Sequence, residues 1–353
     1  MRSTFSNLVR LFGASLVLGV TVALFPTAAI PQTALDDREL PFLTLRNLTG
    51  KDDPGQFYGD ERSGLTAGWC RVREVDLGGL APLAEAAPSF IREELLRVDR
   101  IKGGDSAEVL DALEDTTRGT APAVYVHGYY ISFEKGCRRA ILLQENAGLA
   151  GRFLWFSWPS DGSIAYYTHD EADLYWSVPD LADAIIEAER RFGGDVDVVG
   201  HSLGARGVVL ALYEVANRMP DIRLDQIVLL APDMDFEIFR RMLPRILPIV
   251  EGITIYVAAN DRPLALSAQL HGYPRLGETG NDVASLDGVE VVDLGNLPAG
   301  SPTGHLYHIY SAAVGADLRQ LLNDGLRAAD RSGLLQVGTN KWRLQQRGSP
   351  VQE

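Results

Sequence analysis

The sequence predicts an α/β domain whose mostly parallel β-sheet is covered by helices on both faces. From residue 121 onward, short apolar stretches that are typical of strands alternate with stretches of helical periodicity. The strands are nearly continuous apolar runs, which is typical of parallel strands that are buried on both faces. The chain has 353 residues, enough to bury one large core, and it contains no internal repeat.

The N-terminal segment predicts export. Arg2 and Arg10 precede an apolar run of about 15 residues, and Thr27 and Ala29 then stand as the small residues of a cleavage site. Because a membrane span needs about 20 residues, we interpret 1–29 as a signal peptide that directs the chain to the periplasm or the medium. An uncleaved N-terminal membrane anchor is the alternative.

The charge balance argues against nucleic acid as a partner. The net charge is −14 and no basic tract interrupts the acidic composition. An acidic surface repels phosphate backbones and anionic membrane surfaces alike.

Residues 30–120 form an N-terminal arm that contributes the first strands of the sheet. Residues 50–68 are rich in turn formers and polar, so no regular element is predicted there. Residues 70–78 alternate with period two and predict a strand. Residues 106–117 predict a helix with Ser106 as its N-cap.

Two cysteines, Cys70 and Cys137, are present. In an oxidising compartment they can form one disulfide that ties the arm to the body of the domain. Two unconnected thiols are the alternative. Neither cysteine has the sequence setting of a catalytic thiol or a zinc ligand.

The catalytic core is predicted at 121–328. Its expected strands are 121–128, 152–158, 195–202, 225–233, 252–261 and 289–295. Its expected helices are 132–148, 171–194, 203–218, 236–243 and 305–326. We expect the second helix to start afresh after Pro179, since proline suits a first helical turn. The polar tail at 329–353 is expected to be frayed.

A G-x-S-x-G motif, Gly200-His201-Ser202-Leu203-Gly204, lies where a predicted strand meets a predicted helix. This context is the one that a nucleophile elbow requires. The apex serine takes positive φ, its neighbours two positions away must be small, and the helix N-terminus favours an oxyanion. Ser202 is therefore the candidate nucleophile, the alternative being a serine in a plain turn.

His305 is the candidate general base, because it follows every strand and stands in a loop before the last helix. His308 lies one helical turn further on and is expected to pack inside. The other histidines belong to strand-end motifs or polar loops: His127, His169, His201 and His271.

Three aspartates end predicted strands after the elbow, and each could orient the histidine. Asp261 has the usual topological position. Asp233 is the alternative acid, although it could instead cap the helix that begins near Phe236. Asp293 is the third.

Acyl transfer also needs donors for the oxyanion. The backbone N–H of Leu203 is one candidate. The N–H of Tyr129 is the other, because Gly128 lets the loop after the first core strand approach closely. About 20 residues separate Asp233 from the next strand, so no large cap domain is expected. An aromatic wall of the acyl pocket is expected from residues that could equally pin a loop: Trp158, Tyr166, Tyr167 and Trp176.

These motifs together resemble the α/β-hydrolase superfamily and, within it, the DUF900 family of bacterial proteins. The resemblance rests on VYVHGYYISFEKGCRRA, FLWFSWPSDGS, VVGHSLGARGVVLAL, IVLLAPDMDFEIF, IYVAANDRPLALS and TGHLYH. It covers roughly residues 55–325 and implies Ser202 as nucleophile, Asp261 as acid and His305 as base. Family membership does not supply a substrate.

The expected function is an exported carboxylic-ester hydrolase acting on a small-molecule or lipid ester without a cofactor. An inactive binding or envelope scaffold protein, or a peptidase or acyltransferase with the same triad, are the alternatives. No metal site is expected, because His305 and His308 lack an accompanying H-E-x-x-H motif or cysteine cluster. No oligomeric state is indicated.

Overall fold

The computed structural model describes residues 38–78, 87–117, 120–295, 297 and 303–345. The predicted signal segment at 1–29 lies outside the described residues. The strands are β1 Arg38–Leu48, β2 Tyr58–Glu74, β3 Leu96–Gly104, β4 Ala123–Val126, β5 Phe153–Ser157, β6 Asp197–His201, β7 Leu224–Leu230, β8 Val250–Val257, β9 Val289–Asp293, β10 Leu334–Gln336 and β11 Lys341–Leu344.

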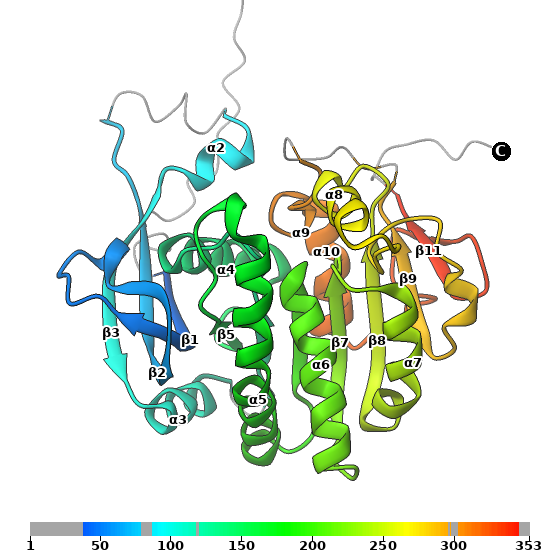
Figure 1. The fold of residues 1–353 in the computed structure, drawn as a ribbon, viewed down its shortest axis with the longest axis horizontal. Coiled ribbons are helices and arrows are strands. Elements are labelled where there is room, and N and C mark those ends of the chain that lie inside the picture. The colour runs from blue at the N-terminus through cyan, green and yellow to red at the C-terminus, as the bar shows by residue number, and fades with distance from the viewer. Residues whose placement is uncertain (1–37, 79–86, 118–119, 296, 298–302, 346–353) are drawn as a thin grey trace, which may run out of the picture. The chain divides into compact units, whose positions relative to one another are not determined.

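These strands form one sheet in the order β10-β11-β9-β8-β7-β6-β4-β5-β1-β2-β3 (Figure 1). The pairs from β11 through β9, β8, β7, β6, β4 and β5 to β1 are parallel, whereas β2, β3 and β10 run antiparallel to their neighbours. The predicted mostly parallel sheet is confirmed, and each of the six predicted core strands is present.

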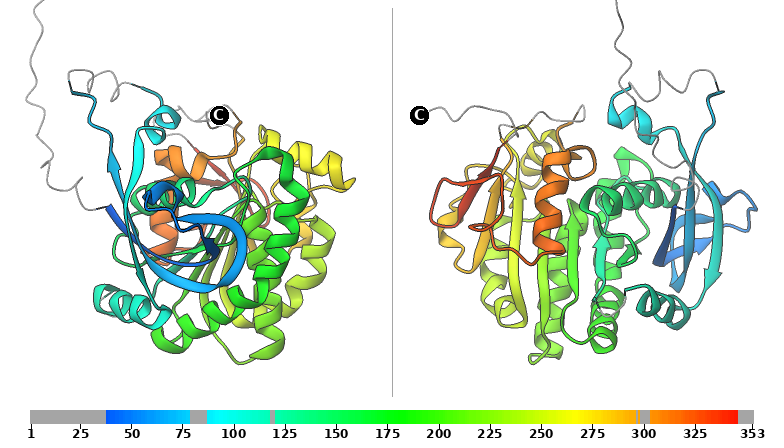
Figure 2. Two further views of the ribbon diagram at one scale, coloured as in Figure 1. Left: turned by 60° about the vertical axis from the view of Figure 1, so that its left-hand side comes forward. Right: turned by 180° about the vertical axis from the view of Figure 1, so that it is seen from behind.

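The helices are α2 Ser89–Glu93, α3 Ser106–Thr117, α4 Phe133–Ala147, α5 Tyr167–Phe192, α6 Leu203–Arg218, α7 Phe236–Ile246, α8 Arg262–His271, α9 Tyr307–Tyr310 and α10 Ala312–Leu322. Helices α5, α6 and α7 cover one face of the sheet, and α4 and α10 cover the other (Figure 2). In β4, Val124 packs under the first layer and Tyr125 under the second. The strands are continuously apolar because both faces are covered.

The N-terminal arm contains more strand than its composition predicts. We expected no regular element at 50–68, but β2 begins at Tyr58 and pairs with β1 along most of its length. Its residues from Asp60 to Thr66 are largely exposed, which explains their polar character. The strand is formed by backbone hydrogen bonds to β1, and a polar sequence does not reveal these. Of the strand predicted at 70–78, residues 70–74 are the end of this longer strand, and 75–78 lie beyond it.

A disulfide joins the arm to the core. Cys70 on β2 is bonded to Cys137 on α4, with the two Cα atoms 6.5 Å apart. The expected bridge is thus confirmed. It connects the antiparallel edge of the sheet to a helix of the second layer.

Two helix starts differ from expectation. Asp105, and not Ser106, caps α3: its carboxylate accepts the N–H of Glu108 at 2.7 Å. Helix α5 runs unbroken through Pro179 instead of restarting there. Because proline has no N–H, the carbonyl of Tyr175 lacks its helical hydrogen bond from residue 179. Tyr175 and Pro179 are both exposed, so water can replace that bond.

The C-terminal part differs in three ways. The single helix expected at 305–326 is divided into α9 and α10, because the Ser311 side chain caps the second helix by accepting the N–H of Val314. Helix α8, which no pattern predicted, follows β8 directly. The tail is not frayed up to residue 345: β10 and β11 form a hairpin, and β11 extends the sheet beside β9. Residues 346–353 lie outside the described residues.

The hairpin is held by contacts that the polar composition of the tail does not predict. Trp342 and Leu344 are buried, and the guanidinium of Arg331 pairs with Asp317 at 3.0 Å and with Glu290 at 3.3 Å. These partners lie far away in sequence, so composition alone could not reveal the anchoring.

No large cap covers the site between β7 and β8: the chain from Leu230 to Val250 forms only α7 and a short 3-10 turn. Among the described residues, none of the helices combines the length and apolar character of a membrane span.

Candidate active site

Ser202 stands at a strained turn between β6 and α6. Its backbone has φ 55° and ψ −121°, outside the regions that non-glycine residues prefer. A Cβ on Gly200 would lie 2.5 Å from the Cα of Ala205, and one on Gly204 would lie 2.1 Å from the carbonyl oxygen of His127. The two glycines therefore allow the tight turn that raises the serine out of the sheet.

The loop after β4 lies directly against this turn. A Cβ on Gly128 would lie 3.0 Å from the Cβ of Ser202. Leu203 is the first residue of α6, so its N–H is one of those that the helix leaves unpaired. The Tyr129 N–H follows Gly128 in the facing loop. The two predicted oxyanion donors thus come from segments that meet at Ser202.

Asp170 on α5 holds the same loop, and sequence reasoning did not identify it. Tyr130 has φ 62°, and its N–H donates to the Asp170 carboxylate at 3.0 Å. The same carboxylate accepts Ser160 Oγ at 2.6 Å and the Asp161 N–H at 2.7 Å. Burial raises the pKa of Asp170 to about 6. No local pattern could indicate this role, because the partners come from separate loops.

The structure brings His305 and Asp261 together. His305 Nδ1 lies 2.6 Å from Asp261 Oδ2, and both side chains are buried. Asp261 follows β8, and its other oxygen caps α8 by accepting the N–H of Leu264 at 3.0 Å. Among the described residues His305 Nε2 has no hydrogen-bond partner, so it does not yet bond Ser202 Oγ. The two side chains line one cavity.

The other two strand-end aspartates are engaged elsewhere. Asp233 lies between Arg206 at 3.3 Å and Arg275 at 3.1 Å, and it accepts the Tyr167 hydroxyl at 2.6 Å. Asp293 pairs with Lys341 at 3.0 Å. The structure therefore places Asp261, and neither of the alternatives, against the histidine.

Asp233 is not a helix cap either. The carboxylate of Asp235 accepts the N–H of Ile238 and caps α7. The alternative role that the sequence offered for Asp233 thus belongs to the residue two positions later.

Two further histidines pack beneath His305. The ring of His201 lies 4.6 Å from that of His305 and 4.2 Å from that of His308, measured between centroids. Burial lowers the pKa of both His201 and His308 well below the usual value, so both rings are neutral at pH 7. His308 is fully buried, as expected.

Two cavities meet at Ser202. The larger, of about 350 Å³, also contains His305 and Tyr130. The smaller, of about 230 Å³, contains Tyr167, Asp233 and the side chains of Pro263, Leu266 and Leu270 from α8. Tyr129 lines both.

Of the four residues expected to form an aromatic wall, Tyr167 alone lines a cavity at Ser202. Trp158 is fully buried and stacks on His127 with ring centroids 5.1 Å apart. Tyr166 and Trp176 are exposed on the surface, the latter under Arg62. These three residues line neither cavity at Ser202.

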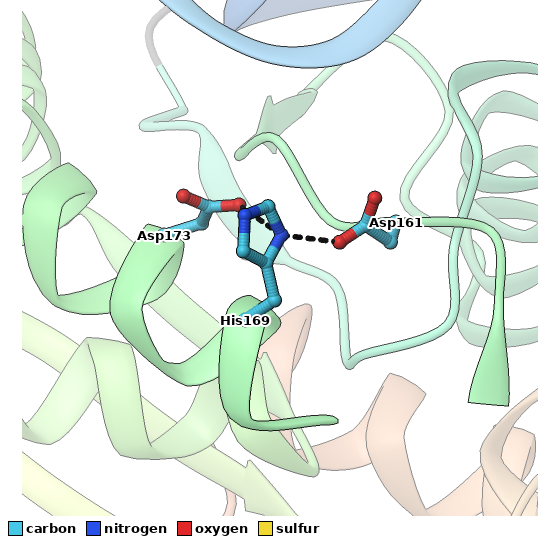
Figure 3. A group of neighbouring side chains, drawn as sticks. All are labelled: Asp161, His169 and Asp173. Carbon is cyan, nitrogen blue, oxygen red and sulfur yellow. Dashed lines mark hydrogen bonds and ion pairs between the residues drawn. The ribbon is translucent and has the colours of Figure 1, made fainter. Parts of the chain in front are cut away.

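A cluster of Asp161, His169 and Asp173 lies at the start of α5 (Figure 3). His169 Nδ1 lies 2.5 Å from Asp161 and 3.5 Å from Asp173, and the hydrogen bond with Asp161 raises the pKa of His169. Arg62 on β2 donates to Asp173 at 2.5 Å. The cluster is therefore engaged in hydrogen bonds and an ion pair, and the Arg62–Asp173 pair joins α5 to β2 of the arm.

The fold and the arrangement around Ser202 define an α/β hydrolase. Residues 105–324 match the family described as alpha/beta hydrolase of unknown function (DUF900), and the chain belongs to this family. No curated protein matches the chain.

Similar solved structures include lipase B from Aspergillus fumigatus, with 16% identity over 59% of this chain and 54% of the lipase, at a TM-score of 0.39. A gene product of Listeria innocua is 10% identical over 64% of this chain and 98% of its own chain, at a TM-score of 0.38. A carboxylesterase from Bacillus subtilis is 13% identical over 58% of this chain and 85% of the carboxylesterase chain, at a TM-score of 0.32. The chain thus spans about half the length of the lipase.

Proposed function

We propose that this chain is a serine hydrolase of carboxylic esters. The observation that supports it most is the 2.6 Å contact between His305 Nδ1 and Asp261, which leaves Nε2 unpaired at the cavity that holds Ser202. A carboxylate that accepts Nδ1–H fixes the tautomer in which Nε2 can take a proton. Hydrogen bonds of this kind are often long before substrate binds.

In the proposed reaction Ser202 Oγ attacks the ester carbonyl carbon and its proton moves to His305 Nε2. The N–H groups of Leu203 and Tyr129 stabilise the oxyanion. The tetrahedral intermediate collapses as His305 protonates the leaving alcohol, and an acyl-enzyme remains on Ser202. Water, deprotonated by His305, then releases the acid and restores the serine.

A fluorophosphonate probe and a series of p-nitrophenyl esters of graded chain length test this proposal on the mature protein. Wild type is expected to be labelled and to hydrolyse the esters, whereas Ser202→Ala shows neither. Ser267→Ala, a buried serine in the adjoining cavity, is the matched control and keeps its labelling. Equal labelling of wild type and Ser202→Ala would sink the proposal.

An inactive scaffold protein is the second candidate, because His305 Nε2 and Ser202 Oγ do not bond each other in this structure. A peptidase or an acyltransferase with the same triad would label but prefer amides or acceptor alcohols. Absence of labelling in wild type supports the scaffold, and labelling without ester turnover supports the other two.

We also propose that the protein is exported. The Cys70–Cys137 disulfide supports this, since such bonds persist in oxidising compartments. Fractionation of cells with intact-mass measurement tests the proposal. A periplasmic or secreted product that lacks about 29 residues is expected, whereas full-length protein in the membrane fraction would indicate an uncleaved anchor.

A further inference from the structure

The larger cavity at Ser202 carries positive charge in a chain whose net charge is −14. Its wall includes Lys135, Arg139 and Arg262, and among the described residues that line it there is no carboxylate. The charge of this cavity wall is therefore opposite in sign to the net charge of the chain.

Arg139 is already neutralised, because Glu93 accepts its Nε–H at 2.8 Å. Lys135 lies in the first turn of α4, with its ammonium 3.8 Å from the centroid of the Tyr130 ring and 3.4 Å from the Tyr130 carbonyl oxygen. Within the described residues it has no carboxylate partner.

Arg262 is the second uncompensated cation. It is the first residue of α8 and is exposed, and its side chain makes no ion pair with any described residue. Lys135 and Arg262 therefore approach the cavity from α4 and α8, two elements separated by more than 100 residues.

The lysine is held in place before any ligand arrives. Tyr130 supplies both of its contacts, and Tyr130 is itself fixed by the hydrogen bond to Asp170 at 3.0 Å. Burial lowers the pKa of Lys135 to about 8, so its ammonium is mostly charged at pH 7. A fixed, partly desolvated cation attracts an anion more strongly than a solvated one.

The position of His305 decides which part of an ester meets these cations. In the proposed reaction His305 protonates the leaving alcohol, so the alcohol must occupy the cavity that His305 lines. That cavity is the larger one. The smaller cavity does not contain His305, and Leu270 lines only this smaller cavity, whereas Leu266 lines both cavities; the acyl chain is therefore assigned to the smaller cavity.

We propose that Lys135 and Arg262 form a subsite for an anionic group, a carboxylate or a phosphate, on the alcohol part of the substrate. This inference rests on the proposed function and deepens it: the substrates are acyl esters of anionic alcohols. The guanidinium of Arg262 can hold either anion by paired hydrogen bonds, and the Lys135 ammonium supplies a point charge.

The test uses two esters that differ only in charge. The anionic probe is 3-butanoyloxy-4-nitrobenzoate, and the neutral probe is the corresponding 3-butanoyloxy-4-nitrobenzamide. Both release a coloured nitrophenol, so kcat/KM is measured in the same way for each. The quantity compared is the ratio of kcat/KM for the anionic probe to that for the neutral probe.

Wild type is expected to favour the anionic probe, and Lys135→Met and Arg262→Gln are each expected to lower the ratio about fivefold. Lys135→Arg keeps the charge and most of the preference. Arg240→Gln, which removes an exposed cation of α7 that lines neither cavity, leaves the ratio as in wild type. Raising the salt concentration to 0.5 M should also reduce the wild-type ratio.

An unchanged ratio in Lys135→Met, Arg262→Gln and the double variant overturns the inference while ester hydrolysis stands. Because Arg262 is exposed, its variant remains informative even if Lys135→Met fails to fold. If wild type hydrolyses neither probe and behaves as Ser202→Ala does, the proposed function fails and the subsite fails with it.

Discussion

At the scale of single residues, the site depends on two strained backbones that are held by other groups. Ser202 and Tyr130 both have positive φ without being glycine, a conformation that costs on the order of 1–3 kcal/mol at each position. Gly200 and Gly204 let the chain turn tightly around Ser202. The buried carboxylate of Asp170 holds Tyr130. Asp170 is thus a positioning residue, because it acts through the loop and touches no reacting atom.

The raised pKa of Asp170 predicts a specific pH dependence of stability. Its pKa is about 6 in the folded protein and 3.8 in the unfolded chain, so between these values the folded state binds more protons. The free energy of unfolding therefore falls as pH rises from about 4 to 6, by at most about 3 kcal/mol, and levels off above. Asp170→Asn is expected to lack this component.

Urea denaturation of wild type and Asp170→Asn at pH 4.5, 5.5 and 7 measures the difference. Asp111→Asn, which changes an exposed carboxylate on α3 in the same way, is the control. Parallel pH profiles for wild type and Asp170→Asn would show that the burial of this carboxyl has no energetic consequence.

At the scale of elements, one carboxylate serves both a helix and the site. Asp261 caps α8 with one oxygen and holds His305 with the other. The start of α8 and the orientation of the histidine are therefore set by the same side chain. Its burial at the tip of β8 keeps both interactions away from water.

Two substitutions separate these roles. Asp261→Asn keeps an oxygen for the Leu264 N–H but offers an amide that cannot accept Nδ1–H, so kcat should fall by about 10³- to 10⁴-fold with little loss of stability. Asp261→Ala should lose similar activity and a further ~1 kcal/mol of stability, because the cap is removed. Ester kinetics and urea denaturation measure the two effects. Full activity in Asp261→Asn would exclude it as the acid.

At the scale of the whole molecule, the antiparallel strands β2 and β3 extend a parallel hydrolase sheet, and one disulfide ties this extension to α4. The bridge joins residues 67 positions apart. Phe42 on β1 packs edge-to-face on Phe133 of α4 beside it. The arm is therefore part of the domain core and not an appendage.

Removing the bridge should destabilise the fold without changing the chemistry. Closing a loop of this length lowers the entropy of the unfolded chain, so Cys70→Ala/Cys137→Ala is expected to unfold about 2–4 kcal/mol more easily. Thermal and urea unfolding of wild type with and without reductant provide the comparison. Because both cysteines lie outside the cavities at Ser202, kcat should stay within about twofold at 25 °C. Equal stability with and without the bridge would contradict the prediction.

The sequence by itself determined the alternation of strands and helices, the turn at Ser202 and the position of His305 after the last core strand. Each of these is a local property: apolar periodicity, the small residues that a tight turn requires, and order along the chain. Local cues failed where distant partners decide the structure, as in the hairpin at 334–344, whose anchoring side chains are buried against other elements.

Only the tertiary structure decided which carboxylate meets the histidine. Asp233, Asp261 and Asp293 all stand at the ends of predicted strands, so the sequence favoured Asp261 by its topological position alone and left Asp233 as an alternative. Asp261, at the start of α8, lies against His305. Asp233 and Asp293 are instead paired with cations, Arg206 and Lys341 respectively. The charged wall of the cavity likewise could not be predicted from the sequence, because Lys135 and Arg262 come to line one cavity with Ser202 only through the order of strands in the sheet.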